Sequence, residues 1–460
     1  MGDSPHRIAL TGQFGIQRLR GSLGYSIAMN ANLFSDDFKP EPYWWDTAPR
    51  PDPVEVTLPA EADVVVVGAG YTGLHAALQT AREGLSTLVL DADVLGFGCS
   101  SRNGGQVSPS VKGTFPELSA RYGREQAIAL LREGIDSLDF LDGFIRDEGL
   151  DCAWERVGRF SGAHTPAAYA ATARDLQALP PEADVEWHMV PRAEQRSEIG
   201  SDLYHGGVVF PDHAALDPGR YHLELLKRVS GAGAYAFGHC AVQLIERIAP
   251  GFVVHTSHGQ VRAGQVVVAT NGYTGAVTKW LQRRVIPIGS YIIATEPLEA
   301  AIADEISPHT RVMSDSRKLV FYYRLSPDRR RMLFGGRVAL KETDPRVSGP
   351  ALHVAMCKIF PQLKAIRITH SWLGFVAYTF DTLPHAGEHD GLHYAMGYCG
   401  SGISLASYCG SAVGSRICGH DDHRTAFDDL KFATRPLYTG DPWFLAPSIL
   451  YYKLRDRLNV

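Results

Sequence analysis

The sequence has few of the patterns that mark metal, disulfide or redox-dithiol chemistry. Its seven cysteines are scattered and odd in number, and no two of them form a CxxC pair. This spacing predicts reduced thiols in a cytoplasmic protein and argues against a disulfide scaffold, a zinc site or a disulfide reductase. None of the 18 histidines belongs to an HxH or HExxH pattern, so a metal centre is disfavoured as well.

Neither sign of charge dominates the chain, and no segment is apolar for long. The 45 Lys and Arg against 50 Asp and Glu give a net charge of −5, so no strong positive field would attract nucleic acid or anionic lipid. No stretch approaches the about 18 apolar residues of a membrane-spanning helix, and the first residues lack the apolar core of a signal peptide. We expect a soluble cytoplasmic protein, monomeric or homodimeric, that binds a small molecule and neither nucleic acid nor membrane.

One glycine-rich segment carries the clearest functional signal. GAGYTG at residues 68–73 follows the valine run DVVVV and opens a helical pattern, and Asp91 ends the next apolar run. In such a βαβ unit Gly68 permits a tight turn, Gly70 lets a pyrophosphate approach the helix N-terminus, and Gly73 lets the helix pack closely on the sheet. Asp91 can accept hydrogen bonds from ribose hydroxyls. The pattern predicts dinucleotide binding; the alternative is a tight turn without a ligand and a solvated Asp91.

Three further glycine clusters bear on which dinucleotide is bound. GFGCSSRNGGQ (96–106) places Arg102, which could neutralise a pyrophosphate, before two glycines that allow backbone to approach a flat ring. VVVATNGYTG (266–275) is typical of a strand that ends in a turn. HYAMGYCGSGISLASYCGSAVG (393–414) is typical of a strand followed by a helix, whose N-terminus would suit the anionic edge of a reduced isoalloxazine. The alternatives are a surface loop with a solvated arginine for the first and a closely packed core helix for the third.

The first 60 residues form an arm before this region. They are rich in proline, aromatic and polar residues and show no sustained period of 2 or 3.6. Tyr43, Trp44 and Trp45 either pack the arm onto its own domain or anchor it to a groove or partner. Beyond the arm, helices are expected near 124–148, 166–178 and from Pro218 with Asp217 as its N-cap, and strands between Ile286 and Leu340.

These segments together resemble the D-amino-acid-oxidase-like superfamily of FAD enzymes. The resemblance rests on the fingerprint with Asp91 and on GFGCSSRNGGQ, ALDPGRYHLELLKRV, VVVATNGYTG, WLGFVAYTFDTLPHAG and MGYCGSGISLA, and it covers roughly residues 40–460. Within that superfamily the YWW of the arm, SRNGGQ and the C-terminal YYKLRDRL are most similar to the gamma-glutamylputrescine oxidoreductase group. The resemblance implies FAD as cofactor and oxidation of a C–N bond of an amine or amino acid to an imine, with hydride transfer to flavin N5.

The resemblance also implies how FAD is held. Some relatives tether FAD through a cysteine in the segment matching GFVAYT, where this chain has Val376, and others through a histidine in the segment matching GFGCSSRNGG, where none stands. We therefore expect noncovalent FAD. The alternative is a link through Cys99, which such an alignment places close to the flavin.

The expected fold is α/β, with a discontinuous Rossmann-like FAD-binding domain of the GR2 type and an inserted, sheet-rich substrate domain. At about 150 residues per domain, the 460 residues allow roughly three domain-sized units. The predicted boundaries are an N-terminal arm at 1–60, the FAD-binding domain at 61–150, 215–285 and 366–435, the substrate domain at 151–214 and 286–365, and a C-terminal tail at 436–460.

Cofactor-binding roles are expected along the four glycine-rich segments, at the turn after the fingerprint's second strand, and at one strand residue near position 240. The predicted residues are Gly68, Gly70, Tyr71, Thr72, Gly73, Asp91, Ala92, Ser100, Ser101, Arg102, Asn103, Gly104, Gly105, Gln106, Val242, Thr270, Asn271, Gly272, Gly400, Ser401, Gly402, Ile403 and Ser404.

Substrate-side roles are expected from aromatic and arginine residues of the later segments. Aromatic rings over a flavin would exclude water and cradle an amine, and an arginine would clamp a substrate carboxylate. For each tyrosine a core position is the alternative, for each arginine a surface ion pair, and for His385 a structural role. The predicted catalytic residues are Tyr291, Tyr323, Arg324, Trp372 and Tyr378, with Tyr322, Arg337 and His385 as further candidates.

The favoured function is an FAD-dependent oxidase acting on CH–NH or CH–NH2 groups, with a gamma-glutamylputrescine-like or other N-substituted amine as substrate and dioxygen as the acceptor that yields H2O2. The alternatives are an FAD-dependent amine dehydrogenase that feeds a quinone or carrier, an oxidase of an unrelated secondary amine, and a non-catalytic flavin-binding protein. Because the amine must lose its proton before oxidation, activity is expected to rise at alkaline pH.

Overall fold

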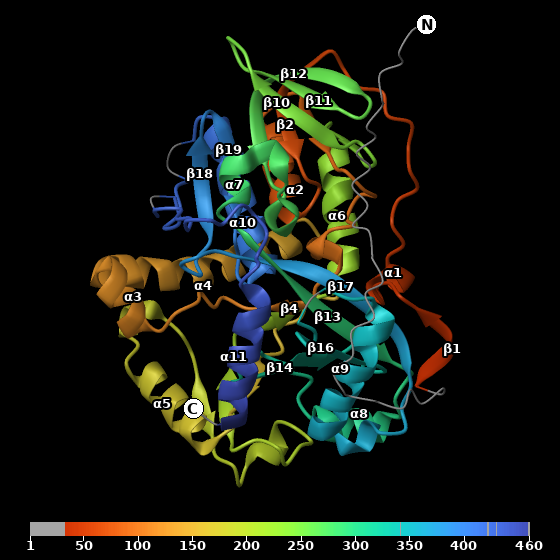
Figure 1. The fold of residues 1–460 in the computed structure, drawn as a ribbon, viewed down its shortest axis with the longest axis vertical. Helices are drawn as coiled ribbons and strands as arrows, with labels where there is room; N and C mark the ends of the chain where they lie inside the picture. Colours follow the sequence, from red (N-terminus) through yellow and green to blue (C-terminus); the bar gives the residue numbers. More distant parts are fainter. Residues whose placement is uncertain (1–32, 341, 421–422, 429, 459–460) are drawn as a thin grey trace, which may run out of the picture. The chain divides into compact units, whose positions relative to one another are not determined.

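The computed structural model describes residues 33–340, 342–420, 423–428 and 430–458. Residues 1–32 of the predicted arm lie outside the described residues. Two sheets form the framework of the described part, one of nine strands and one of eight (Figure 1). All seven cysteines are unpaired, and no helix among the described residues is both long and apolar enough to cross a membrane.

The eight-stranded sheet contains the strand that precedes the glycine fingerprint. The valines of β2 (Glu61–Val67) are buried on both faces, as expected for a central strand of a parallel sheet with helices on its faces. Five strands run parallel in the order β19, β12, β2, β3 and β9. β18 pairs antiparallel with β19, and β10 and β11 form an antiparallel extension on β12. The other strands are β3 (Thr87–Leu90), β9 (Tyr235–Phe237), β10 (Val242–Arg247), β11 (Phe252–Thr256), β12 (Gly259–Val268), β18 (His385–His389) and β19 (Leu392–Met396).

The nine-stranded sheet lies below the first in Figure 1 and is mostly antiparallel. Two of its strands come from segments that the sequence analysis assigned elsewhere: β17 (Ile368–Tyr378) from the 366–435 segment and β1 (Phe34–Lys39) from the arm. β17 joins this sheet because it pairs with β13 along that strand's whole length. The remaining strands are β13 (Ile286–Thr295), β16 (Met332–Gly336), β15 (Tyr322–Leu325), β14 (Val312–Asp315), β5 (Arg159–Gly162), β7 (Gly207–Phe210) and β6 (His188–Val190), and a separate ribbon pairs β4 (Gln106–Val107) with β8 (Ala214–Ala215).

Helices form where the sequence predicted them. α6 begins at Pro218, and its N-cap Asp217 accepts hydrogen bonds from the backbone N–H groups of Gly219 and Arg220 at 2.9 and 3.0 Å. The helices are α1 (Trp44–Thr47), α2 (Tyr71–Arg82), α3 (Phe115–Tyr122), α4 (Arg124–Asp147), α5 (Pro166–Gln177), α6 (Pro218–Gly231), α7 (Lys279–Gln282), α8 (Ala300–Ile306), α9 (Pro345–Ile359), α10 (Gly402–Ile417) and α11 (Leu445–Leu458).

Strand register gives the nine-stranded sheet two different faces. Side chains that pair across neighbouring antiparallel strands share a face. One face, which we call the inner face, carries Tyr322, Arg324 and Trp372, and the side chains of residues 99–106 contact it. The other, the outer face, carries Tyr291 and Tyr323 and packs in a hydrophobic core with residues of α9.

α2 and α10 pack side by side with little space between their backbones. A Cβ atom added at Gly410 would meet the Thr72 carbonyl oxygen well inside van der Waals contact, and one added at Gly414 would lie 2.7 Å from the Ala76 carbonyl oxygen. The glycines of α10 are therefore turned toward α2. The pairing of both residues with successive turns of α2 shows that the two helices run parallel.

Gly410→Ala is expected to destabilise the protein because the added methyl group must push apart two backbones. We expect a loss of about 1–3 kcal/mol in the free energy of unfolding, measured by urea denaturation. Gly231→Ala is the matched control, since Gly231 is also helical and nothing lies within 4 Å of its added Cβ atom. Equal stability of the two variants would contradict the close α2–α10 contact.

Candidate functional site

The glycine fingerprint forms a tight turn between β2 and α2, and the N-cap residue of that helix has no side chain. Gly68 has a φ of +107°, and an added Cβ at Gly73 would fall on the Gly68 carbonyl oxygen. Gly70 is the N-cap of α2, and no side chain caps it. Tyr71 and Thr72, also predicted to bind the cofactor, begin the helix and are buried. The first turn of α2 thus presents backbone N–H groups where an anion can approach.

Asp91 lies beside this turn, at the end of the neighbouring strand β3. Its carboxylate accepts hydrogen bonds from the N–H groups of Ala69 at 2.8 Å and Asp93 at 3.2 Å, and burial raises its pKa. Ala92 follows it in the turn. Val242 begins β10 two residues after Cys240, whose N–H donates to the Asp91 carbonyl oxygen at 2.7 Å. The structure therefore brings the fingerprint, Asp91, Ala92 and the start of β10 to one edge of the sheet.

The segment 96–106 contacts the fingerprint through Ser100. Ser100 Oγ accepts a hydrogen bond from the Tyr71 N–H at 3.0 Å, and a Cβ at Gly70 would lie 3.0 Å from the same oxygen. The Ser101 hydroxyl donates to the Gly96 carbonyl oxygen. Serine hydroxyls and bare backbone thus line the meeting place of the two glycine-rich segments.

Arg102 is held by the protein itself. Its Nε donates to the Phe97 carbonyl oxygen at 2.6 Å and its Nη1 to the Leu373 carbonyl oxygen at 3.2 Å. The guanidinium lies over the rings of Trp45 and Phe97, 4.7 and 4.2 Å from their centroids, and burial lowers its pKa. The sequence prediction of a pyrophosphate contact by this side chain remains a prediction.

The glycines that follow Arg102 dock on the inner face. A Cβ at Gly104 would lie 3.2 Å from the Tyr322 ring. Arg324, buried, donates through Nη1 to the carbonyl oxygens of Gly105 at 2.6 Å and Leu216 at 2.9 Å. Gln106 donates through Nε2 to the Tyr323 carbonyl oxygen at 3.0 Å. Arg324 therefore positions the loop, and it forms no ion pair with the residues placed in the structure, whereas a surface ion pair was the alternative for it.

The glycine-rich clusters at 266–275 and 393–414 contact each other just before the start of α10. Asn271, between Thr270 and Gly272 and with a φ of +44°, accepts a hydrogen bond through Oδ1 from the Gly397 N–H at 2.9 Å. The predicted residues Gly400, Ser401, Gly402, Ile403 and Ser404 follow that strand into α10, whose N-terminus has no side-chain cap. Gly410 is eight residues into α10 and Thr72 one residue into α2, so α10 starts about 10 Å ahead of α2. Two uncapped helix N-termini in this relation fit an extended dinucleotide.

The five predicted catalytic residues divide between the two faces of the nine-stranded sheet. Tyr291 and Tyr323 lie on the outer face, where the Tyr323 hydroxyl is 2.7 Å from that of Tyr204 and Tyr291 OH accepts from the Thr343 N–H at 2.8 Å. Trp372, Arg324 and Tyr378 lie on the inner face, toward the cofactor loop. Tyr378 is partly accessible, and burial raises its pKa to about 12.

The three further candidates have different surroundings. Tyr322, partly accessible on the inner face, has its hydroxyl 2.9 Å from Ser290 Oγ. Arg337 is buried, donates to the Gly289 carbonyl oxygen and pairs with Glu342 at 3.1 Å. His385 is buried, 3.0 Å from an Asp381 carboxylate oxygen and stacked on the Phe432 ring at 4.1 Å, which is the surrounding of a structural histidine.

Two cations near the inner face escaped the sequence analysis. Arg159 of β5 donates to His213 Nδ1 at 2.9 Å and to Ser314 Oγ at 3.2 Å, and burial lowers its pKa to about 10. Lys112 has an accessible side chain, yet burial and the nearby charges of Arg159 and Lys318 lower its pKa.

Lys112 and Arg159 carry positive charge without a counterion. Neither forms an ion pair within the described residues, and His213 is kept neutral because burial and Arg159 hold its pKa well below the usual range. The two cations lie close enough to influence each other, because the charge of Arg159 contributes to the lowered pKa of Lys112. No sequence motif surrounds either cation, so only the fold could reveal them.

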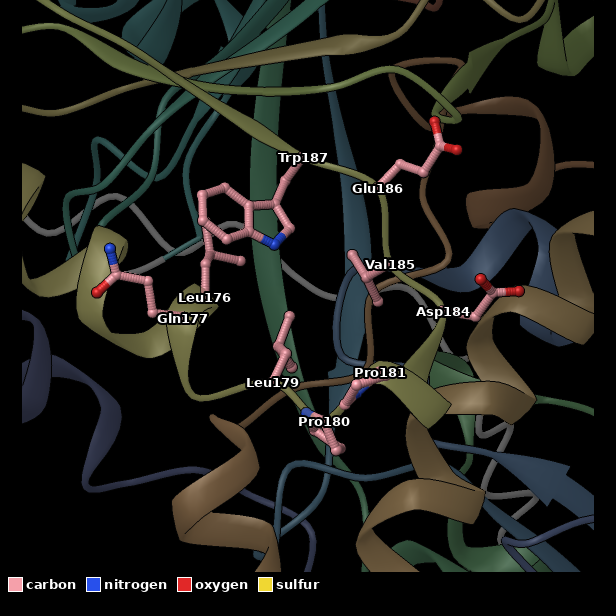
Figure 2. A pocket seen from close by; sticks show the side chains of 9 residues that line it. All are labelled: Leu176, Gln177, Leu179, Pro180, Pro181, Asp184, Val185, Glu186 and Trp187. Carbon is pink, nitrogen blue, oxygen red and sulfur yellow. The ribbon is translucent and has the colours of Figure 1, made fainter.

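No other feature of the described chain competes for the role of functional site. No cluster of three His, Cys, Asp or Glu side chains suited to a metal occurs in the ranges that the structure describes. Figure 2 shows a hollow of about 300 Å³ at the end of α5, and none of its lining residues is a predicted site residue. These lining residues are Leu176, Gln177, Leu179, Pro180, Pro181, Asp184, Val185, Glu186 and Trp187.

Comparison with known proteins agrees with this geometry. The DAO family, described as FAD dependent oxidoreductase, matches residues 63–416. The chain is 31% identical to the probable oxidoreductase OrdL of Haemophilus influenzae, over 86% of this chain and 92% of that protein. It is also 31% identical to gamma-glutamylputrescine oxidoreductase of Escherichia coli, over 86% of this chain and 93% of that protein.

Solved structures share the fold at lower sequence identity. Glycine oxidase from Geobacillus kaustophilus superposes with a TM-score of 0.68 at 17% identity, over 82% of this chain and 99% of that one. L-proline dehydrogenase from P. horikoshii superposes with a TM-score of 0.64 at 17% identity, over 85% of this chain and 99% of that one.

Proposed function

The chain belongs to the DAO family of FAD-dependent oxidoreductases, which act on amines or amino acids, and from that premise we propose that it is an oxidase of an amine that also carries a carboxylate. A gamma-glutamylated amine has both groups, and the similarity to gamma-glutamylputrescine oxidoreductase favours that class. Dioxygen is the proposed electron acceptor.

The residues present fit FAD. The uncapped start of α2 and Ser100 suit the pyrophosphate, Asp91 keeps lone pairs for a ribose, and the uncapped start of α10 suits the anionic edge of the ring system. FAD when bound supplies the redox chemistry, since it accepts the hydride equivalent from the substrate. The protein supplies binding, orientation and exclusion of water, for which Tyr322 and Tyr378 on the inner face are placed.

The uncompensated charge of Arg159 and Lys112 is the observation that carries the choice of substrate class. A cation surrounded by protein is costly unless an anion neutralises it, and the partners of Arg159 within the described residues are neutral. A substrate carboxylate would supply the missing charge through hydrogen bonds to the guanidinium. The same positive charges disfavour the protonated form of the substrate amine, and oxidation requires the neutral form.

Arg159→Met is expected to weaken binding of substrates with a carboxylate. KM for gamma-glutamylputrescine should rise by about 10- to 100-fold, the range for a lost charge-assisted hydrogen bond, and wild-type preference over the alpha-methyl ester should disappear. Arg156→Met is the control, because Arg156 is nearby in sequence and pairs with Asp139 and Asp142 on the surface. An unchanged ester preference in a variant that retains flavin would contradict the proposed carboxylate site.

Lys112→Gln is expected to move the pH dependence of flavin reduction upward. In the wild type, positive charge beside the substrate lowers the pKa of its bound amine, so the reduction rate at saturating substrate rises with pH at a lower midpoint than for the free amine. Removing one positive charge lets the amine hold its proton to higher pH. Anaerobic stopped-flow reduction between pH 6 and 10 measures the midpoint, and a downward or absent shift would count against this role.

Turnover under air is expected to yield one H2O2 per substrate oxidised. A peroxidase-coupled assay run beside an oxygen electrode measures both quantities. If reduced enzyme persists in air and is reoxidised only by a quinone or dye, the chain is a dehydrogenase of the same family.

The flavin is proposed to be noncovalent. Burial raises the pKa of the Cys99 thiol to about 11, and the thiolate is the nucleophilic form, so this cysteine is poorly suited to form a tether. Acid precipitation should leave the flavin spectrum in the supernatant. Colour in the pellet that is lost in Cys99→Ser would show a tether through that residue.

A further inference from the structure

The arm before the fingerprint passes through the cofactor region. We propose that residues 33–50, which we call the strap, position the cofactor loop at residues 99–105, and that Trp44, Trp45 and Trp372 are the positioning residues. This role concerns how FAD is held, so it stands apart from the identity of the substrate.

Three indole N–H groups bind three consecutive residues of the cofactor loop. Trp45 Nε1 donates to Ser101 Oγ at 2.8 Å, Trp372 Nε1 to the Arg102 carbonyl oxygen at 2.7 Å, and Trp44 Nε1 to the Asn103 carbonyl oxygen at 2.7 Å. Two of these donors come from the strap and one from β17. The loop is therefore held at three successive residues, through one side-chain hydroxyl and two backbone carbonyls.

One end of the strap is fixed to the nine-stranded sheet. β1 pairs in parallel with β17, with Phe34 opposite Ile368. Trp44 is fully buried in a cluster on the inner face that includes Trp372. Asp46 of the strap has a carboxylate oxygen 3.0 Å from Nε2 of His370, which belongs to β17. The strap is thus attached to the sheet that carries the predicted substrate-side residues.

The other end of the strap reaches the fingerprint through α6. Thr47 Oγ1 donates to the N-cap Asp217 at 2.8 Å, and Arg50 donates to the Gly219 carbonyl oxygen at 3.1 Å. Arg50 also lies 3.2 Å from His222 Nδ1, and His222 Nε2 is 2.8 Å from the Ala69 carbonyl oxygen of the fingerprint. One short segment therefore links the inner face, the cofactor loop and the dinucleotide turn.

The cofactor loop needs such external support. Gly104 and Gly105 have no side chains to anchor, and the loop's one 3₁₀ turn covers only Cys99–Ser101. Trp45 also covers the Arg102 guanidinium, so the strap holds a side chain of the loop as well as its backbone. Loss of an indole donor is expected to loosen the loop where it faces FAD.

A double-mutant cycle on FAD affinity tests the proposal. Trp45→Phe and Ser101→Ala are each expected to raise the dissociation constant of FAD by about 3- to 10-fold, measured by titration of apoprotein with flavin fluorescence. Because both variants remove the same hydrogen bond, their effects should be less than additive in the double variant. Trp45→Phe should also change the visible circular dichroism of the bound flavin, which reports the asymmetry of its surroundings.

Trp154→Phe is the matched control. Trp154 Nε1 donates to Asp142 at 2.6 Å on the surface of α4, so its loss removes the same kind of bond away from the loop. It is expected to leave FAD affinity and the flavin dichroism unchanged.

Thermal melting of the apoprotein distinguishes a loss of stability from a loss of loop positioning. A Trp45→Phe protein that melts at a lower temperature but binds FAD with wild-type affinity and dichroism overturns the proposal. Trp45 is only partly buried, so of the three tryptophans it is the one whose replacement should disturb folding least.

Discussion

The contact of α2 with bare backbone on two sides is the constraint on which the site depends. On one side Gly73 lies against the Gly68 carbonyl, and on the other Gly410 lies against the Thr72 carbonyl. No side chain fits at either contact, so the helix start stays close both to the sheet and to α10. This packing sets the separation between the two helix N-termini, neither of which has a side-chain hydrogen bond from its N-cap residue, and two such N-termini suit a ligand with two anionic regions.

The second organising feature is the loop that joins the two sheets. Residues 99–106 touch the fingerprint through Ser100 and the inner face through Tyr322 and Arg324. The loop has glycines where a planar ring needs space. Arginine and tryptophan donors on other elements bind it in addition to the hydrogen bonds that Asn103 makes within it. Cofactor and substrate surfaces are thereby held in one geometry, which is what a reaction between a bound amine and a flavin requires.

Charge distinguishes the two halves of the site. Around the fingerprint the protein offers neutral N–H donors and hydroxyls, which suit a ligand that brings its own negative charge. Near the inner face it offers Lys112 and Arg159, and neither of them forms an ion pair with any residue that the structure describes. A small molecule with a carboxylate at one end and an oxidisable amine at the other would satisfy the second region, while the same field keeps the amine deprotonated.

The local pattern of the chain determined the dinucleotide turn, its helix and Asp91, because each depends on residues within about 30 positions and on steric rules that hold in any protein. It also determined the family. Tertiary structure decided which of two adjacent tyrosines faces the cofactor loop, since register alone sends Tyr322 inward and Tyr323 outward. It likewise decided that the arm's tryptophans bind the cofactor loop and that Lys112 lies near Arg159. These contacts join residues far apart in sequence, and no local periodicity encodes them.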